Sequence, residues 1–303
     1  MQKLLMIWGY IRMNNQDKIK TALESIEKGL ATINTDKDWK NYLKFCSSFY
    51  NYSHNNIILI MMQRPNATFV AGFTAWKKMN RYVKKGEKGI GILCPCIRKV
   101  EELKEPDDTK VYNDKEAEKE VKKIITGFKI GYVFDITQTD GDDSMLPVLV
   151  TGLQGSSEQE KAVYEALLKY VSSKYCVQEV AGISAKGSYN ITTKEITVRS
   201  DLQYQQKLKS LLHELSHAID FDMHPDMEIP RNKRELIAES CAYVVCLRLG
   251  IDTSSYSFSY LKSWLKDPKE LGEIADCVQK ISAKIINELA ESEDFAFSDL
   301  VEE

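Results

Sequence analysis

Apolar residues recur at helical spacing along much of the chain. Residues 16–30 carry aliphatic side chains every three or four positions, which places these side chains on one face of a helix. Asp201 can cap a helix that starts near Gln203, and Gly250 is suited to end a helix at Leu249. The periodicity predicts helices over residues 16–30, 36–49, 158–171, 203–221, 234–249 and 268–289.

Other stretches have the composition and alternation of strands. Residues 127–136 alternate and are rich in β-branched and aromatic residues, so they predict a strand. Residues 187–190 and 195–199 predict a hairpin just before the helix at 203–221, and residues 147–150 predict a further short strand. We therefore expect an α+β fold.

The chain is long enough for two domains. With 303 residues and 43% hydrophobic content it can bury one large core or two ordinary ones, and we expect two. Residues 139–144 contain one glycine and three aspartates, a composition typical of a linker. The expected layout is a leader at residues 1–14, a first domain at 15–143, a second domain at 144–290 and an acidic tail at 291–303.

Two segments are expected to lie outside the folded core. Residues 101–123 are mostly charged and poor in apolar residues, so they predict an exposed, poorly ordered insertion in the first domain. Residues 4–11 are apolar, but they are short and no small-residue cleavage site follows them, so they do not predict a signal peptide. We expect residues 1–12 to be dispensable, with Met13 as the natural start.

Charge is distributed unevenly along the chain. Residues 1–150 carry 24 lysines and arginines against 19 acids, whereas residues 151–303 carry 17 against 25. Within residues 64–99, nine cations accompany a single acid, and four aromatic residues are interleaved with them. Lysines that follow a phosphate backbone, together with aromatic faces on which bases stack, favour binding of single-stranded DNA. The alternative is a solvated basic surface around a core tryptophan.

Residues 213–217 read His-Glu-Leu-Ser-His, which is the HExxH pattern. His213 and His217 are four residues apart on the predicted helix, so both imidazoles project from one face and can share a metal ion. Glu214 lies at the flank of this face, where it can reach a water on the metal without being a ligand, and this suits a general base. Half of the four histidines of the chain lie in this motif, which favours a metal site over a chance match.

A catalytic zinc site needs a third protein ligand. The metzincin pattern requires Gly and His at positions where this chain has Asp220 and Met223. Residues 234–242 instead resemble the ExxA[DEN]xxA segment of peptidases of the HExxH-plus-Glu type. The resemblance implies Glu235 as the third ligand, in preference to Glu239. It also implies that Glu239 accepts a hydrogen bond from a ligand histidine and fixes its tautomer.

The chemistry predicted for this site is zinc-dependent peptide hydrolysis. Glu214 takes a proton from the activated water and later returns it to the leaving amine. An oxyanion stabiliser is also needed, and the two residues that we consider for this role are Tyr189 and Tyr243. In zincin folds a strand before the metal helix commonly edges the cleft and can pair with an extended peptide. The strand at residues 187–190 fits this role, although it can equally be an ordinary edge strand.

The first half of the chain contains a series of short motifs in a fixed order. They include Tyr-Ser-His-Asn-Asn at 52–56, Gln-Arg-Pro-Asn-Ala-Thr at 63–68, Val-Lys-Lys-Gly-Glu-Lys-Gly-Ile at 83–90 and Val-Phe-Asp-Ile-Thr-Gln-Thr at 133–139. In order and spacing these motifs resemble the N-terminal domain of ArdC-type antirestriction proteins, over about residues 15–140.

This resemblance implies a single-stranded-DNA-binding domain fused to an HExxH metallopeptidase-like domain. It also implies proteins carried by conjugative plasmids and integrative elements. Phe134 and Asp135 match the family pattern but can equally be structural. Carried over by position, the resemblance implies DNA contacts at Asn55, Trp76, Arg81, Lys84, Lys85 and Lys88.

We therefore expect a DNA-binding metalloendopeptidase of a mobile element that serves antirestriction or the protection of incoming DNA. The expected cofactor is zinc (Zn2+), with Mn2+ or another divalent ion as the alternative. Two other functions stay open: a DNA-binding protein whose metal site is only structural, and a repressor-cleaving peptidase that resembles the ImmA/IrrE regulators. The protein substrate is not predicted.

The cysteine content and hydropathy bear on the compartment. Seven cysteines, an odd number without a disulfide framework, predict free thiols and a reducing, cytoplasmic environment. Because no apolar run is long enough to cross a bilayer, we expect no membrane partner.

Overall fold

The computed structural model describes residues 14–103, 119–144, 146, 157–225, 228–251, 253, 256, 258–265 and 267–292. The predicted strand at residues 147–150 lies outside the described residues, as do nearly all of the predicted leader and acidic tail and most of the charged insertion.

The described chain is a mixed α/β protein. Its helices are α2 (Asn15–Ala31), α3 (Asp36–Ser48), α4 (His54–Gln63), α5 (Phe73–Lys78), α6 (Ser157–Ser172), α7 (Tyr204–Met223), α8 (Arg231–Arg248) and α9 (Pro268–Ala290), with 3-10 turns η1 (Ile136–Gln138) and η2 (Leu261–Ser263). Its strands are β1 (Val70–Gly72), β2 (Arg81–Val83), β3 (Ile90–Leu103), β4 (Lys119–Asp135), β5 (Thr139–Gly141), β6 (Cys176–Val180), β7 (Gly187–Asn190) and β8 (Glu195–Arg199).

Side-chain caps start each of the first three helices. Asn14 accepts a hydrogen bond from the backbone N–H of Asp17 at the start of α2, and Thr35 does the same for α3. Ser53 caps α4 through the backbone N–H of Asn56. Each cap satisfies a backbone donor that the first turn of a helix leaves without a partner. Together the helices bury Ile26, Leu30, Trp39, Tyr42, Leu43, Ile57 and Ile60.

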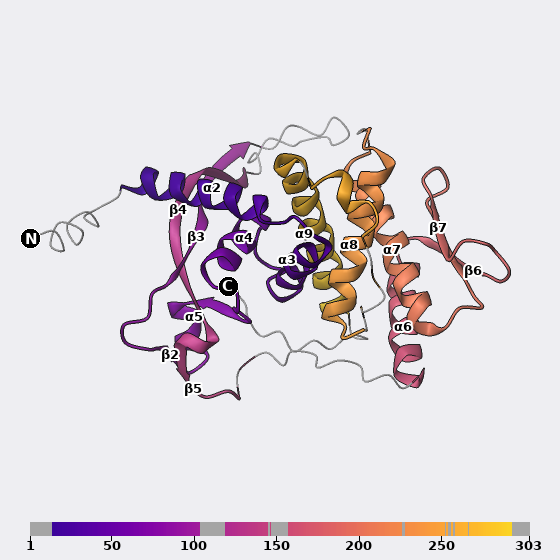
Figure 1. Cartoon of the computed structure of the whole chain (residues 1–303), viewed down its shortest axis with the longest axis horizontal. Coiled ribbons are helices and arrows are strands. Elements are labelled where there is room, and N and C mark those ends of the chain that lie inside the picture. The colour runs from indigo at the N-terminus through magenta and orange to yellow at the C-terminus, as the bar shows by residue number, and fades with distance from the viewer. Residues whose placement is uncertain are drawn as a thin grey trace, which may run out of the picture.

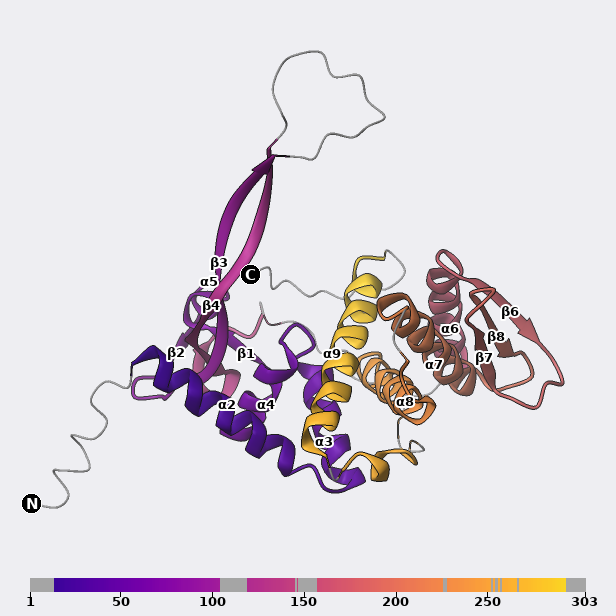
Figure 2. The same ribbon diagram turned by 90° about the horizontal axis from the view of Figure 1, so that it is seen from above.

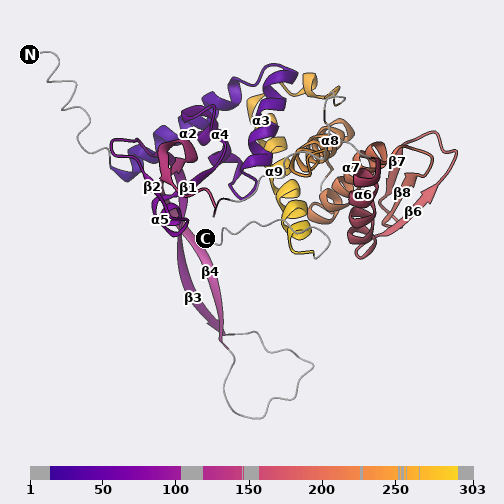
Figure 3. The same ribbon diagram turned by 90° about the horizontal axis from the view of Figure 1, so that it is seen from below.

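The long strands β3 and β4 form an antiparallel ribbon that extends away from the helices (Figures 2 and 3). At its base the Asn56 side chain bonds to both the N–H and the carbonyl of Leu93, and Gln63 does the same at Gly91. β4 also pairs with β1, which gives the order β1-β4-β3. The ribbon corrects the prediction for residues 101–123, because residues 101–103 pair with 119–121, and residues 122 and 123 pair with Val100 and Lys99 in the same two strands.

The described C-terminal half combines a small sheet with four long helices, α6 to α9. Strand β8 lies between β6, which is parallel to it, and β7, which is antiparallel. Ile196 and Val198 alternate along β8 and are fully buried, while the side chains between them are half-buried. This alternation is that of a sheet with one face against the core, and α7 is the helix that packs on β7 and β8.

Two helix starts differ from the sequence prediction. The prediction that Asp201 caps α7 is wrong, because the capping position is occupied by Gln203, whose side chain makes no cap hydrogen bond, and Asp201 pairs with Arg199 instead. Helix α8 begins at Arg231, three residues before the expected position, and follows Pro230. The expected end of α8 is confirmed, since Gly250 has a φ of 69°, a left-handed conformation that glycine adopts without strain.

One hydrophobic core runs through both halves of the described chain, and α3 of the first half lies beside α8 of the second (Figure 1). The indole N–H of Trp39 on α3 donates to the hydroxyl of Ser240 on α8 at 3.0 Å. Tyr42 donates to the carbonyl of Ala275 on α9 at 3.3 Å. The helices of the first half therefore pack directly on the helices of the second, and a separation into two domains at residue 143 stays a prediction.

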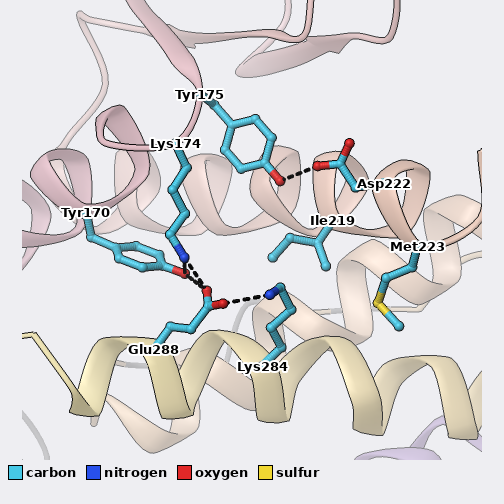
Figure 4. A pocket seen from close by; sticks show the side chains of 8 residues that line it. All are labelled: Tyr170, Lys174, Tyr175, Ile219, Asp222, Met223, Lys284 and Glu288. Carbon is cyan, nitrogen blue, oxygen red and sulfur yellow. Dashed lines mark hydrogen bonds and ion pairs between the residues drawn. The ribbon is translucent and has the colours of Figure 1, made fainter. Parts of the chain in front are cut away.

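A cluster of charged and tyrosine side chains ties α9 to α6 and α7 (Figure 4). Glu288 accepts hydrogen bonds from Lys174 and Lys284, each at 2.6 Å, and from the Tyr170 hydroxyl. Burial alone would raise the pKa of Glu288, but these three donors lower it to about 2. The Tyr175 hydroxyl donates to the carboxylate of Asp222 on α7. All of these side chains line one cavity of about 310 Å³. Because its charged groups are already paired with one another, we interpret this cluster as a clamp between helices.

All seven cysteines are free thiols, as predicted. In the described part of the chain, none of the helices combines the length and apolarity that a bilayer crossing requires.

Candidate metal centre

Helices α7 and α8 bring the three predicted ligands together. His213 and His217 project from the same face of α7, and their Nε2 atoms are 3.2 Å apart. Glu235 lies one turn into α8, and its Oε2 is 3.4 Å from Nε2 of His213 and 3.6 Å from Nε2 of His217. The predicted convergence of these side chains is therefore present in the structure.

The spacing of these three atoms fits a shared metal ion. Metal–nitrogen and metal–oxygen bonds of 2.0–2.2 Å at tetrahedral angles place ligand atoms about 3.3 Å from one another. The observed separations of 3.2, 3.4 and 3.6 Å agree with this value. Elsewhere among the described residues, no second group of three histidine, cysteine or carboxylate ligands comes together in this way.

The electrostatics of the trio favour a cation. Hydrogen bonding with His213 and then with His217 lowers the pKa of Glu235 far below its usual range. Burial alone would lower the pKa of His213, but the neighbouring carboxylates, Glu235 first, raise it. Hydrogen bonds with the two histidines thus hold Glu235 in its ionised form, which is the form that metal ligation requires.

Glu214 lies beside the trio but outside it. It is 8% exposed, and burial raises the pKa of its carboxyl group, which His213 and His217 partly offset. Its carboxylate accepts a hydrogen bond from the backbone N–H of Tyr189 on β7. A side chain at Gly187 would place its Cβ 3.0 Å from both Cγ and Oε1 of Glu214. Strand β7 can therefore approach Glu214 this closely because residue 187 is glycine.

A buried ion pair fixes α8 against α7 next to the trio. Nη1 of Arg234 lies 2.6 Å from Oδ2 of Asp220, and the two side chains are 9% and 1% exposed. His224 approaches the other oxygen of Asp220 at 3.0 Å through Nδ1. The Arg234 guanidinium also stacks 3.7 Å from the ring centre of Phe221. This network was not predicted from the sequence, although Arg234 immediately precedes the predicted ligand.

A cavity of about 600 Å³ opens above the trio. It is lined by residues 187–189 of strand β7, by Glu228 and Ile229, and by the start of α8. Tyr189, Phe221 and Ile229 contribute apolar surface to a cavity whose other lining side chains are mostly charged or polar. Because the strand order is β6-β8-β7, strand β7 is an edge strand of the described sheet, and it borders the cavity, which is one of the two alternatives that the sequence left open.

The two tyrosines considered as oxyanion stabilisers are not directed at the trio. The charged neighbours of the Tyr189 hydroxyl are Asp222 and Lys194, although the ring itself lines the cavity. Tyr243 is 3% exposed and packs edge-on against Tyr256 and Phe258. Neither assignment is supported by the structure, and the cationic groups that do line the cavity are Arg231 and Arg234.

The hydrogen bond predicted for Glu239 is also absent from the described residues. Glu239 is half-buried one turn after Glu235, and burial raises the pKa of its carboxyl group. Its charge acts on His213 without a hydrogen bond between them. The structure therefore does not place Glu239 where it would fix the tautomer of a ligand.

Two of the predicted DNA contacts are wrong. Trp76 is fully buried, and its indole N–H donates to the carbonyl of Phe134 at 2.8 Å. Arg81 is 7% exposed and holds β5 through the hydroxyl of Thr139, the carbonyl of Gly141 and the carboxylate of Asp143. Neither side chain can stack on a base or follow a phosphate backbone from these positions, because each is buried and hydrogen-bonded within the first half of the chain.

The remaining predicted contacts face solvent. Asn55 is exposed at the start of α4, and Lys84, Lys85 and Lys88 are exposed in the loop between β2 and β3. Lys84 also pairs with Asp140 at 3.3 Å, while 41% of its side chain stays exposed. For these four residues, a contact with DNA stays a prediction.

Comparisons with known proteins agree with part of this interpretation. Residues 14–134 match the family model of the N-terminal domain of anti-restriction factor ArdC, so this segment belongs to that domain family and the predicted resemblance is confirmed there. A Bacillus anthracis protein, uncharacterized protein pXO2-81, is 26% identical over 289 residues. The match covers 82% of this chain and 46% of the relative, so the chain spans about half the length of that relative.

Two solved structures of the antirestriction protein ArdC from the R388 plasmid are also similar. The metal-free structure is 19% identical and has a TM-score of 0.46, with 78% of this chain and 85% of that chain covered. The Mn(II)-bound structure is 18% identical and has a TM-score of 0.45, with 83% and 99% covered.

Proposed function

We propose that this protein is a DNA-binding metallopeptidase that protects the DNA of a mobile genetic element. The observation that carries the peptidase half is the convergence of His213, His217 and Glu235, whose ligand atoms all lie within 4.8 Å of one another beside an open cavity. Two imidazoles and one carboxylate with room for a fourth ligand are the donor set of a catalytic zinc site. Mn2+ is the alternative metal, since carboxylate ligands suit it as well.

The residues around the trio divide the catalytic work. A divalent ion held there supplies Lewis-acid activation of a water molecule and of a peptide carbonyl. Glu214 takes the proton from the water and delivers it to the leaving amine, a role for which its burial and raised pKa are suited. The Tyr189 N–H holds the Glu214 carboxylate in place until substrate enters. Asp220 and Arg234 keep α8, and with it Glu235, in register with α7.

Strand β7 provides a docking edge for an extended peptide. The N–H of Arg199 on β8 bonds to the carbonyl of Lys186, which fixes the alternation of hydrogen bonds along β7. By this alternation the backbone groups of Gly187 and Tyr189 point away from β8 and toward the cavity. A substrate strand can pair with these groups and extend the sheet across the metal centre.

The DNA-binding half of the proposal rests on the family of residues 14–134 and on the exposed lysines Lys84, Lys85 and Lys88. Clustered lysines follow a phosphate backbone with little sequence preference. We propose single-stranded DNA as the ligand, and antirestriction as the process that binding serves. With seven free thiols the proposed compartment is the cytoplasm.

The experiment that tests the enzyme half compares wild type with Glu214→Gln. The full chain is loaded with zinc, its metal content is measured, and protein cleavage is compared across the proteome of a host cell. We expect one ion per chain in both proteins and cleavage only in wild type. Equal cleavage by both proteins would refute the assignment of Glu214. If neither protein cleaves a target while metal stays bound and DNA protection is intact, the metal is structural and the protein is a DNA-binding protein. If one dominant target is cut in a Glu214-dependent way, a repressor-cleaving peptidase is favoured.

A further inference from the structure

The β3–β4 ribbon carries cations and no exposed acid over the part whose side chains the structure describes. Residues 90–100 and 122–134 contain Arg98, Lys99, Lys122, Lys123 and Lys129, and they contain neither aspartate nor glutamate. The ribbon extends away from the helices (Figures 2 and 3), and all five of these side chains are exposed. A projecting element with a single sign of charge attracts a polyanion.

One face of this ribbon also exposes large apolar side chains. Paired residues of an antiparallel ribbon share a face, and residues two apart on one strand share it as well. The register pairs Pro95 with Phe128 and Ile97 with Ile125, which puts all four on one face. Phe128 is 46% exposed, Ile97 56% and Ile125 58%. Monomeric proteins rarely leave such a row of hydrophobic side chains in water unless it binds something.

The same face reaches lysines at both ends, although between Phe128 and Tyr132 its paired residues Leu93 and Ile130 pack in the core. Toward the body it includes Tyr132, which is 52% exposed and lies four residues along β4 from Phe128. Tyr132 lies against the loop that presents Lys88, since a Cβ at Gly89 would be 2.9 Å from the Cβ of Tyr132. Toward the far end the face reaches the paired residues Lys99 and Lys123.

We propose that single-stranded nucleic acid binds along this ribbon face, which we define as Tyr132, Phe128, Ile97, Ile125, Lys99 and Lys123. Phe128 and Tyr132 are the stacking platforms that the buried Trp76 cannot provide. At about 3.3 Å per residue the two rings are roughly 13 Å apart, a distance that an extended strand spans with about two nucleotides. The lysines at the two ends neutralise the phosphates on either side. This inference rests on the proposed DNA-binding function and adds the surface that carries it.

The charge pattern favours a nucleic acid over a protein on this face, and it also limits the length of the contact. Between Lys99 and Lys122 the sequence becomes acidic, with nine aspartates and glutamates against four lysines in residues 101–121. A phosphate backbone is repelled by that segment. The bound strand therefore runs from the ribbon toward the lysines of the 84–88 loop.

The test measures binding of a fluorescent oligothymidylate to the full chain by anisotropy. The first variant, Phe128→Ala with Tyr132→Ala, removes both platforms, and Tyr260→Ala, an exposed tyrosine at 41% in the C-terminal half, is its control. The second variant, Lys99→Ala with Lys123→Ala, removes two cations, and the exposed pair Lys262→Ala with Lys269→Ala is its control. Circular dichroism and thermal melting confirm that each variant is folded.

We expect the aromatic variant to bind roughly tenfold or more weakly at every salt concentration, because each lost stacking contact costs affinity independently of charge. We expect the lysine variant to flatten the dependence of log affinity on log salt by about 1.4, or 0.7 for each lost contact. Both control variants bind as wild type.

If wild type binds and the ribbon variants bind equally well, the inference is overturned and the proposed function stands. If wild type binds no single strand, both fail together. Tighter binding of a duplex of the same length, lost in the same variants, would reassign the ribbon to double-stranded DNA and overturn the inference as stated.

Discussion

The buried ion pair between Asp220 and Arg234 gives a quantitative test of how the metal centre is held. Replacing Arg234 with methionine keeps most of the side-chain volume but leaves the Asp220 carboxylate, 1% exposed, with His224 as its remaining partner in the cluster. Removing one partner of a buried pair costs roughly 3–5 kcal/mol of stability, because a buried charge is left uncompensated. We expect Arg234→Met to lower the free energy of unfolding by this amount.

The double variant Asp220→Asn with Arg234→Met separates the charge from the packing. It removes both charges, so most of the lost stability should return, with the free energy of unfolding within about 1–2 kcal/mol of wild type. The matched control for stability is Arg231→Met, the same substitution three residues earlier on α8, where the side chain is 91% exposed. Because Arg231 also lies 3.5 Å from Glu235, this variant is a control for stability and not for zinc affinity. This control should change stability by less than about 0.5 kcal/mol.

The assay is urea denaturation of the metal-free full chain, followed by zinc titration of the folded proteins. Because Arg234 precedes Glu235, we expect Arg234→Met to weaken zinc binding by about 10- to 100-fold, as is usual when the support of a metal ligand is lost. A loss of stability below about 1 kcal/mol, or unchanged zinc affinity, would refute the reasoning that this pair positions the ligand.

Three further predictions follow from single contacts. His54 is 5% exposed, and burial lowers its pKa from 6.5 to about 4. Between these two pH values the unfolded state binds a proton at His54 that the folded state does not bind, so the free energy of unfolding should fall by about 3 kcal/mol from pH 7 to pH 4. Urea denaturation of His54→Gln over the same pH range should lack this part of the fall. Gly187→Ala should push Glu214 aside and reduce peptide cleavage by about tenfold or more at unchanged metal content, and full activity would contradict the close approach of β7. Trp76→Phe should cost about 1 kcal/mol of stability through the lost bond to Phe134 but leave oligothymidylate affinity unchanged, and a large loss of affinity would restore Trp76 as a DNA contact.

Local features of the site could be predicted from the sequence because they depend on helix geometry alone. The four-residue spacing of His213 and His217 determines that their imidazoles share a face wherever the helix lies. The position of Glu235 next to the histidines could not be derived from helix geometry alone, since it depends on how α8 packs on α7. Periodicity indicates that both helices exist, but only the resemblance to HExxH-plus-Glu peptidases indicated which residue of α8 meets the histidines.

Composition could not show which basic and aromatic residues face solvent. Trp76 and Arg81 belong to the cationic, aromatic-rich segment at 64–99, yet both are buried and bonded to β4 or β5. Phe128 and Tyr132, by contrast, belong to a segment that the sequence describes only as a strand. Their exposure depends on the ribbon leaving the body, which is a property of the tertiary structure.

Long-range contacts explain the other differences between prediction and structure. The bond from Trp39 to Ser240 and the pair formed by Asp220 and Arg234 join residues on different helices, and nothing in either local sequence indicates the partner. The shared core of the two halves has the same origin. Gly187 could have been recognised as a site of close backbone approach, but not as the neighbour of Glu214.

The proposed enzyme function requires His213, His217 and Glu235 to hold one divalent ion. Zinc titration by calorimetry on the full chain tests this directly, with Glu235→Gln and Glu239→Gln as a matched pair one turn apart on α8. We predict one tight site per chain in wild type and in Glu239→Gln, and loss of that site in Glu235→Gln. Wild-type affinity in Glu235→Gln, or loss of the site in Glu239→Gln alone, would contradict the assignment of the third ligand and with it the metal centre described above.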